Sequence, residues 1–405
     1  MATINLIDID ITARENNSHF IEESKSIFKE FPLVDYRKLS RDSINYLPLH
    51  IRQPFDVESI IKQIPNDVFL MMQQGIIRPL IVMFTEHWDL FDTYAWHKNK
   101  YNLTPDFGNV PYSKMIQHFT NRSVPEENIT WIVPMDLHLK QIQFLRAKGY
   151  KIKTKFIQYD YFLEQMKPFA KKTNITGRKF TKHFSCLCRG RQKNHRFGIV
   201  YEIWREGLLD KGNVSCEPYV ELHETKQSNW IDDTLSTSTF MSKFKDWDTN
   251  KDTFKKHLPL DFDLNAKLLV APEITKDQSK IFYDSFLWIS SETKKQHDGV
   301  YITEKTWKAI AHGSPFCING DNGSLDYLHQ QGYKTFADFW DESYDNENDV
   351  EKIKRISGIV KNICSMDIRE INALYEKMIP ILEHNRQTLI NNAQHSNLIK
   401  ELSNV

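Results

Sequence analysis

The sequence predicts an α/β protein built from two halves, each with its own sheet, and ending in a helical tail. At 405 residues the chain is longer than one hydrophobic core usually supports. Short apolar runs alternate with longer helical patterns, which is typical of parallel sheets. A polar segment interrupts this alternation, which then starts again. We therefore predict a first domain over 1–166, a linker over 167–182, a second domain over 183–348 and a helical tail over 349–405, with the two sheet domains facing a cleft.

The first half contains four runs with the length and composition of strands. They lie at 1–9, 78–84, 129–133 and 153–158. A helical pattern covers 138–148, and Gly149 follows it at the position where a glycine commonly ends a helix. These strands are therefore predicted to be joined through helices.

The second half repeats the alternation of strands and helices. The predicted order is a strand at 183–188, a basic turn, a helix over 194–206 that ends at Gly207, strands near 267–271 and 285–290, a helix after Thr303 that ends at Gly313, and a strand over 315–318. From 349 to 402 the apolar residues recur at helical spacing. The passage over 313–320 reaches the carboxyl end of a strand, the edge where open α/β sheets hold their ligands.

Charge is balanced over the whole chain but unevenly distributed. The 53 Lys and Arg residues equal the 53 Asp and Glu residues, so the protein as a whole has no electrostatic attraction for nucleic acid or an anionic membrane. Between 151 and 196, however, thirteen Lys or Arg residues accompany only Asp160 and Glu164. This basic segment is compatible with a polyanionic binding partner.

The composition is that of an ordinary globular protein, with a hydrophobic fraction of 40 % and a charged fraction of 26 %. The longest apolar stretch, 76–84, is far shorter than the roughly 20 residues that a membrane helix needs. Residues 1–10 lack the pattern of a secretory signal, so we expect a cytoplasmic protein without a membrane span. The five cysteines have no paired spacing and are expected to be reduced thiols.

A helix that begins after Thr303 carries the first candidate site. Thr303 is a good N-cap, and Glu304 and Lys305 fall in the first turn, where free backbone N–H groups favour an anion. A lysine there opposes the helix dipole, so we interpret Lys305 as the partner of a bound phosphate. The alternative is that Glu304 and Lys305 form a solvated surface pair and that Gly313 only ends the helix.

A cluster of arginines marks a second turn between a strand and a helix. Arg189, Arg191 and Arg196 follow the predicted strand at 183–188 and open the next helix. In such a turn guanidinium groups and helix amides can converge on a diphosphate. The alternative for each arginine is an ordinary surface charge.

The residues around Thr303 form a longer motif. The segment YITEK at 301–305 is preceded by SET at 291–293 and followed by GSP at 313–315 and by Gly320. This motif resembles the nucleotide-sugar signature of family 10 glycosyltransferases, the α1,3-fucosyltransferase group. The continuation to 345 also looks like phage-encoded glycosyltransferase-like proteins. The resemblance covers about a third of the chain, in its C-terminal half.

The resemblance implies a GT-B architecture of two Rossmann-like domains, in which the C-terminal domain holds a GDP- or UDP-sugar and the N-terminal domain the acceptor. By position, Lys305 would contact the donor phosphate and Glu304 the ribose. Glu292 and Tyr301 would lie on the sugar or base side, and Thr303, which follows Tyr301 in the motif, would belong to the same donor-binding set. The arginine that these enzymes carry before the motif corresponds to Arg196. A phage-encoded protein of this kind would act in the host cytoplasm.

Transfer with inversion requires a base that takes the proton from the acceptor hydroxyl, normally a carboxylate of the acceptor domain. The predicted strand at 78–84 leads directly to Glu86 and His87, and the strand at 129–133 leads to Asp136. Glu86 is the first choice, with His87 and Asp136 as alternatives. Both residues also have structural alternatives. Glu86 would then flank the N-cap of a helix, and His87 would pack in the core or cap a helix.

Two Asp-x-Asp triplets, Asp8 with Asp10 and Asp261 with Asp263, have the spacing that metal-dependent glycosyltransferases use. Such triplets arise by chance in an acid-rich chain, and Arg and Lys already supply charge for a diphosphate. We therefore expect no obligate metal.

Three functions follow from these observations. The first is a glycosyltransferase that moves a sugar from a nucleoside-diphosphate sugar to a glycan or another acceptor hydroxyl. The second performs the same chemistry on a hydroxymethylated base of phage DNA, which the basic segment permits and the balanced total charge disfavours. The third is a non-catalytic protein that binds a nucleotide sugar or a glycan.

Overall fold

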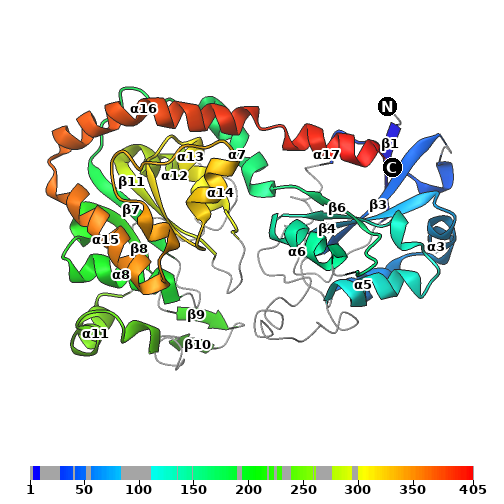
Figure 1. Cartoon of the computed structure of the whole chain (residues 1–405), viewed down its shortest axis with the longest axis horizontal. Coiled ribbons are helices and arrows are strands. Elements are labelled where there is room, and N and C mark those ends of the chain that lie inside the picture. Colours follow the sequence, from blue (N-terminus) through cyan, green and yellow to red (C-terminus); the bar gives the residue numbers. More distant parts are fainter. Residues whose placement is uncertain are drawn as a thin grey trace. The chain divides into compact units, whose positions relative to one another are not determined.

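The computed structural model describes residues 3–9, 28–39, 42–51, 56–83, 111–134, 136–147, 149–188, 194–216, 219–222, 226–229, 239–258, 260, 276–293 and 300–404. The chain forms two compact units (Figure 1). Unit 1 comprises Met1–Tyr161, Lys295–Gly299 and Ala393–Val405, and unit 2 comprises Phe162–Lys294 and Val300–Asn392. Each unit contains a parallel sheet, which confirms the predicted α/β class.

The sheet of unit 1 has six parallel strands in the order β2-β1-β3-β4-β5-β6. Their bounds are Thr3–Ile7 (β1), Leu33–Val34 (β2), Ser43–Ile51 (β3), Ile77–Met83 (β4), Thr130–Val133 (β5) and Lys155–Gln158 (β6). The four predicted strands are confirmed as β1, β4, β5 and β6. Strand β3 was not predicted because Asn45, Pro48 and His50 interrupt its apolar run. Asn45 is nevertheless buried, since the Asn5 side chain donates to its Oδ1 at 3.0 Å.

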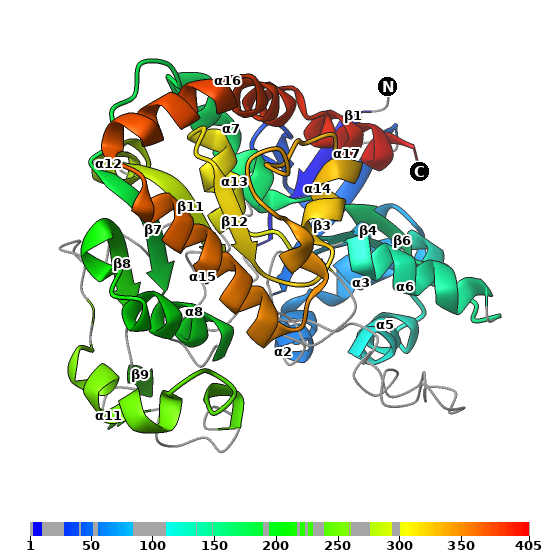
Figure 2. The ribbon, with the colours of Figure 1, turned by 60° about the vertical axis from the view of Figure 1, so that its left-hand side comes forward.

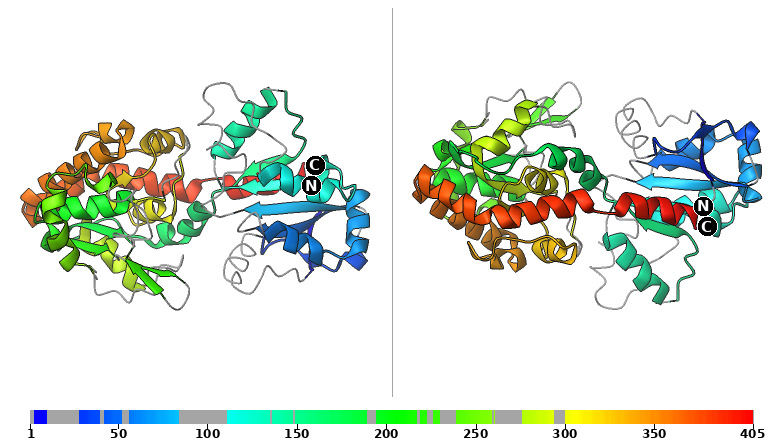
Figure 3. Two further views of the ribbon diagram at one scale, coloured as in Figure 1. Left: turned by 90° about the horizontal axis from the view of Figure 1, so that it is seen from below. Right: turned by 90° about the horizontal axis from the view of Figure 1, so that it is seen from above.

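Helices surround this sheet, with bounds Asp56–Gln63 (α2), Asn66–Gln73 (α3), Pro111–Thr120 (α5), Asp136–Ala147 (α6) and Gln394–Ser403 (α17). Helix α6 confirms the predicted helix, and Gly149 follows it with φ +89°. Helix α17 comes from the far end of the chain and lies beside the N-terminal strands (Figure 3). The Tyr46 hydroxyl of β3 donates to the Leu402 carbonyl at 3.0 Å. Asp160 and Gln394 exchange two further hydrogen bonds of 2.9 and 2.7 Å.

The sheet of unit 2 has four parallel strands in the order β12-β11-β7-β8 (Figure 2). Their bounds are Lys182–Cys188 (β7), Gly212–Cys216 (β8), Ser285–Ser291 (β11) and Phe316–Asn319 (β12). Strands β7, β11 and β12 were predicted and are confirmed, whereas β8 was not predicted. The strand expected near 267–271 lies outside the described residues. A separate antiparallel pair joins Tyr219–Leu222 (β9) to Lys226–Asn229 (β10).

The helices of unit 2 are Tyr161–Lys172 (α7), Asn194–Arg205 (α8), Trp247–Lys256 (α11), Lys276–Asp284 (α12), Glu304–Ala311 (α13), Ser324–Gln330 (α14), Asp349–Ser365 (α15) and Ile368–Asn391 (α16). Short 3₁₀ helices cover Tyr36–Lys38 (η2) and Glu126–Asn128 (η4) in unit 1, and Leu209–Lys211 (η5) and Ser343–Asn346 (η7) in unit 2. Gly207 and Gly313 end α8 and α13 with φ +70° and +59°, as predicted. The described part of the predicted tail consists of three helices that divide between the units, because α15 and α16 belong to unit 2 and α17 belongs to unit 1.

The segment 167–182, expected to be a linker, is folded into unit 2. Its first residues continue α7, and the change of unit falls earlier, between Tyr161 and Phe162. The helical period escaped the sequence interpretation because most of the buried face of α7 precedes the segment. That face consists of Tyr161, Leu163, Met166 and Ala170.

The remainder of this segment is held by Arg178, which is buried. Its guanidinium donates to the carbonyl groups of His312 and Gly313, the last at 3.3 Å. A cation there also complements the carboxyl end of α13.

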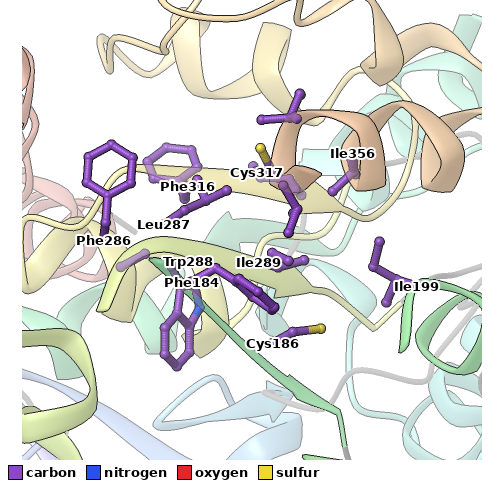
Figure 4. Packing of buried hydrophobic residues seen from close by; sticks show 14 of the residues in the cluster. Phe184, Cys186, Ile199, Phe286, Leu287, Trp288, Ile289, Phe316, Cys317 and Ile356 are labelled. Atoms are coloured by element: carbon purple, nitrogen blue, oxygen red, sulfur yellow. The ribbon is translucent and has the colours of Figure 1, made fainter. Parts of the chain in front are cut away.

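The core of unit 2 is built on β11, whose seven residues are all buried (Figure 4). Side chains from β7, β11 and β12 pack with Ile199 of α8 and Ile356 of α15. All five cysteines are buried, and none of them forms a disulfide in this structure. None of the helices in the described part of the chain is long and apolar enough to cross a membrane.

Candidate functional site

The strand order of unit 2 creates a point where the chain changes direction across the sheet. From β7 the chain moves to β8 on one side, and it later returns to β11 on the other side. The carboxyl ends of β7 and β11 are therefore neighbours whose connections lead away from each other. Open α/β sheets bind ligands at such switch points. Arg196 follows β7, and Glu292 follows β11, so both predicted site residues belong to this edge.

Glu292 is fully buried and binds the start of α13. Its Oε1 accepts hydrogen bonds from the backbone N–H groups of Thr303 and Thr306, both at 3.2 Å. The Thr306 hydroxyl donates to the same oxygen at 2.6 Å, and the Thr303 hydroxyl donates to Oε2. Burial raises the pKa of Glu292, while Lys305 and the two hydroxyls oppose that rise. The anion at the amino end of α13 is therefore a side chain of the protein, at the place where the sequence led us to expect a phosphate.

Thr303, Glu304 and Lys305 form a connected group in front of Glu292. Thr303 is the N-cap of α13, as predicted, and accepts from the Lys305 backbone N–H at 3.5 Å. The Lys305 ammonium donates to the Thr303 hydroxyl at 3.0 Å and to Glu304 Oε1 at 2.7 Å. Burial alone would raise the pKa of Glu304, but Lys305 and Lys308 lower it to about 2. Both members of the Glu304–Lys305 pair remain partly exposed, at 22 % and 23 %.

Arg196 fastens α8 to the end of β11. Its Nε donates to the Ser291 carbonyl and its Nη2 to the Thr293 hydroxyl, each at 3.2 Å. The guanidinium group is largely buried, with 8 % of the residue exposed. Arg196 therefore supplies a positive charge at this edge and also holds the backbone that leads to Glu292.

Two residues of this edge were not predicted from the sequence. His195 donates from Nε2 to the Glu292 carbonyl at 2.8 Å, and the Asn319 amide donates to the His195 carbonyl at 3.0 Å. Asn319 is the last residue of β12 and precedes Gly320, which was part of the recognised motif. Its place at the end of a predicted strand is the signal that could have identified it.

Tyr301 lies nearby but is buried, with its ring 6.3 Å from that of Phe162 in α7. One region of unit 2 thus contains six of the predicted site residues, namely Arg196, Glu292, Tyr301, Thr303, Glu304 and Lys305. Arg189 and Arg191 fall outside the described residues, as do Glu86 and His87. Asp136 is the first residue of α6, shortly after β5, and its side chain is not described.

Five of the thirteen Lys and Arg residues of the basic segment make the following contacts within the protein. Lys153 pairs with Glu127 at 3.5 Å, Lys155 with Glu401 at 3.2 Å, and Lys167 with Glu164. Arg178 and Arg196 donate to backbone carbonyl groups, as described above. The segment therefore provides less free positive charge than its composition indicates.

No group of three or more His, Cys, Asp or Glu side chains is arranged to hold a metal ion within the described ranges. Asp8 lies exposed after β1. Asp10, Asp261 and Asp263 lie outside these ranges.

Comparison with protein-family models, with curated proteins and with solved structures found no match.

Proposed function

We propose that the protein is a glycosyltransferase that moves a sugar from a GDP- or UDP-sugar to an acceptor hydroxyl, and that unit 2 binds the donor. In this proposal the two units are the acceptor-binding and donor-binding domains of a GT-B architecture. The observation that carries the proposal is the switch point between β7 and β11. It brings Arg196, Glu304 and Lys305 to the edge where α/β sheets bind nucleotides.

The roles of the side chains follow from their exposure and charge. Lys305 is partly exposed, so its ammonium group can meet the donor diphosphate. Glu304 is ionised, and its Oε2 has no hydrogen-bond partner among the described residues, which suits a carboxylate that accepts from a ribose hydroxyl. Glu292 is fully buried under α13, so in this proposal it supports Thr303 and Lys305 instead of contacting the sugar. The acceptor and the base belong to unit 1, with Glu86 as the proposed base and His87 and Asp136 as alternatives.

A glycan or another small acceptor is favoured over DNA. Electrostatic binding of DNA relies on lysines and arginines that can reach phosphates. In the basic segment several of these residues already pair with acids or with backbone carbonyls.

We expect Lys305→Ala to weaken the binding of GDP or UDP by roughly 10- to 150-fold, because a hydrogen bond to a charged group contributes about 1.5–3 kcal/mol. The matched control is Lys354→Ala. Lys354 also pairs with a glutamate, Glu351, at 2.8 Å, but on α15. The measurement is a thermal-shift titration of the wild-type protein and both variants, since a ligand at 100 times its Kd stabilises the folded state by about 2.7 kcal/mol. Equal shifts for Lys305→Ala and the wild type would contradict the phosphate role.

Sugar transfer is expected to persist in EDTA, because Lys305 and Arg196 offset the charge of the leaving diphosphate in this proposal. The measurement is release of nucleoside diphosphate from the donor, before and after chelation. Loss of turnover that magnesium or manganese restores would revive the triplets at Asp8 and Asp261.

A further inference from the structure

The loop at residues 320–323 lies directly against the candidate site. It leaves β12 after Asn319 and leads into α14. Gly320 packs on Glu292, so closely that a Cβ atom at Gly320 would lie 3.1 Å from the Glu292 Cβ. Any shift of this loop would therefore change the space beside Glu292 and the start of α13.

A buried ion pair between Lys352 and Asp345 holds this loop through hydrogen bonds. Lys352 of α15 has no exposed surface, and its Nζ donates to the Gly320 carbonyl at 3.0 Å. Asp345 lies 3.8 Å from Nζ and is itself buried. Asp345 Oδ2 accepts from the Leu325 N–H at 2.9 Å, and its carbonyl accepts from the Gly323 N–H at 3.4 Å. Both ends of the loop are thus bound to the same pair.

Stability alone is a weak reason for a lysine at this position. An apolar residue of similar volume usually serves a buried site as well as an ion pair does, because burying two charges costs solvation energy. The neighbours on α15, Val350, Ile353 and Ile356, are buried and apolar. What Lys352 supplies, and an apolar residue cannot, is a donor aimed at one carbonyl of the loop.

We propose that Lys352, held by Asp345, is a positioning residue of the donor site, which keeps the 320–323 loop against Glu292 so that the start of α13 presents Lys305 to the nucleotide. This inference rests on the proposed function of unit 2. Lys352 does not contact the donor and acts through Gly320.

The test uses the full-length chain and three variants. Lys352→Met keeps the volume of the side chain and removes the donor, and Asp345→Asn/Lys352→Met also removes the lone carboxylate. The control is Arg205→Met, which breaks another partly buried pair of unit 2, to Glu202 at 2.7 Å, at the far end of α8. Circular dichroism checks that each variant is folded. Titration calorimetry then measures the Kd for GDP and for UDP, and hydrogen exchange follows the amides of residues 320–325.

We expect both Lys352 variants to bind nucleotide at least 10-fold more weakly than the wild type and to exchange the loop amides faster. Arg205→Met should keep the wild-type Kd within about 2-fold. Wild-type affinity in a folded Lys352 variant would overturn this inference and leave the proposed function standing. If Lys352→Met does not fold, the double variant decides between these outcomes. If the wild-type protein binds neither nucleotide, the proposed function fails, and this inference fails with it.

Discussion

Replacing Glu292 with alanine is expected to lower the free energy of unfolding by roughly 4 kcal/mol or more. The substitution leaves two backbone N–H groups and two hydroxyl groups at the start of α13 without their acceptor. Each buried donor that loses its partner costs about 1–3 kcal/mol. The negative charge that complements the amino end of the helix is lost as well. Glu292→Gln, which keeps one acceptor oxygen, should lose less than alanine does.

Urea unfolding followed by circular dichroism measures this loss. The control is Glu351→Ala, since Glu351 is an exposed carboxylate in an ion pair with Lys354 and should contribute roughly 0–1 kcal/mol. A loss below about 1 kcal/mol for Glu292→Ala would mean that water or another group replaces the carboxylate. Glu292 would then not be the group on which the start of α13 depends.

Lowering the pH from 7 to 5 is expected to destabilise the wild-type protein by roughly 2 kcal/mol through His312 alone. The ring is buried at the end of α13 and stacks on Phe282 at 4.5 Å. Neither ring nitrogen has a hydrogen-bond partner among the described residues. Burial, assisted by the charges of Arg178 and Lys308, lowers the pKa of His312 to about 3.

The sign of the effect follows from which state binds the proton. The unfolded chain protonates His312 near its ordinary pKa of about 6.5, whereas the folded protein resists protonation until about pH 3. Unfolding therefore becomes easier as the pH falls between these two values, by up to about 1.4 kcal/mol per pH unit. In His312→Leu this contribution should disappear.

The measurement is urea unfolding at pH 7, 6 and 5 for the wild type, His312→Leu and His257→Leu. His257 is an exposed histidine of the same unit and serves as the control for replacing a histidine with leucine. If His312→Leu follows the wild-type pH dependence, the ring is accessible to protons in the folded protein.

The sequence predicted those elements whose signal is local. Strand β11 is a continuous apolar run, and α13 has an N-cap threonine at one end and a glycine with positive φ at the other. Strand β3 escaped prediction because its polar residues are satisfied by partners far along the chain, such as Asn5 for Asn45. A pattern within one segment carries no information about such partners.

The candidate site was predicted in part for the same reason. Thr303 as N-cap and the position of Lys305 in the first turn follow from neighbouring residues. That Glu292 turns under α13 and takes its amides depends on how the end of β11 meets the helix in three dimensions. The sequence therefore indicated an anion at this place without indicating that the protein provides it. The contribution of Lys352, many residues later on α15, was equally invisible to local patterns.

The docking of α17 on unit 1 has a consequence for synthesis on the ribosome. Residues 3–161 leave the ribosome before any of unit 2, yet the helix that covers Tyr46 and buries Leu398 and Leu402 is translated only after residue 392. Domains usually fold in the order of their emergence, from the N-terminus onward. Here all residues of unit 2 are synthesised before α17, so unit 1 cannot complete its fold until after unit 2 has been translated. Until then an apolar face of unit 1 stays uncovered. During that interval the face is exposed apolar surface, which is prone to aggregation until α17 covers it.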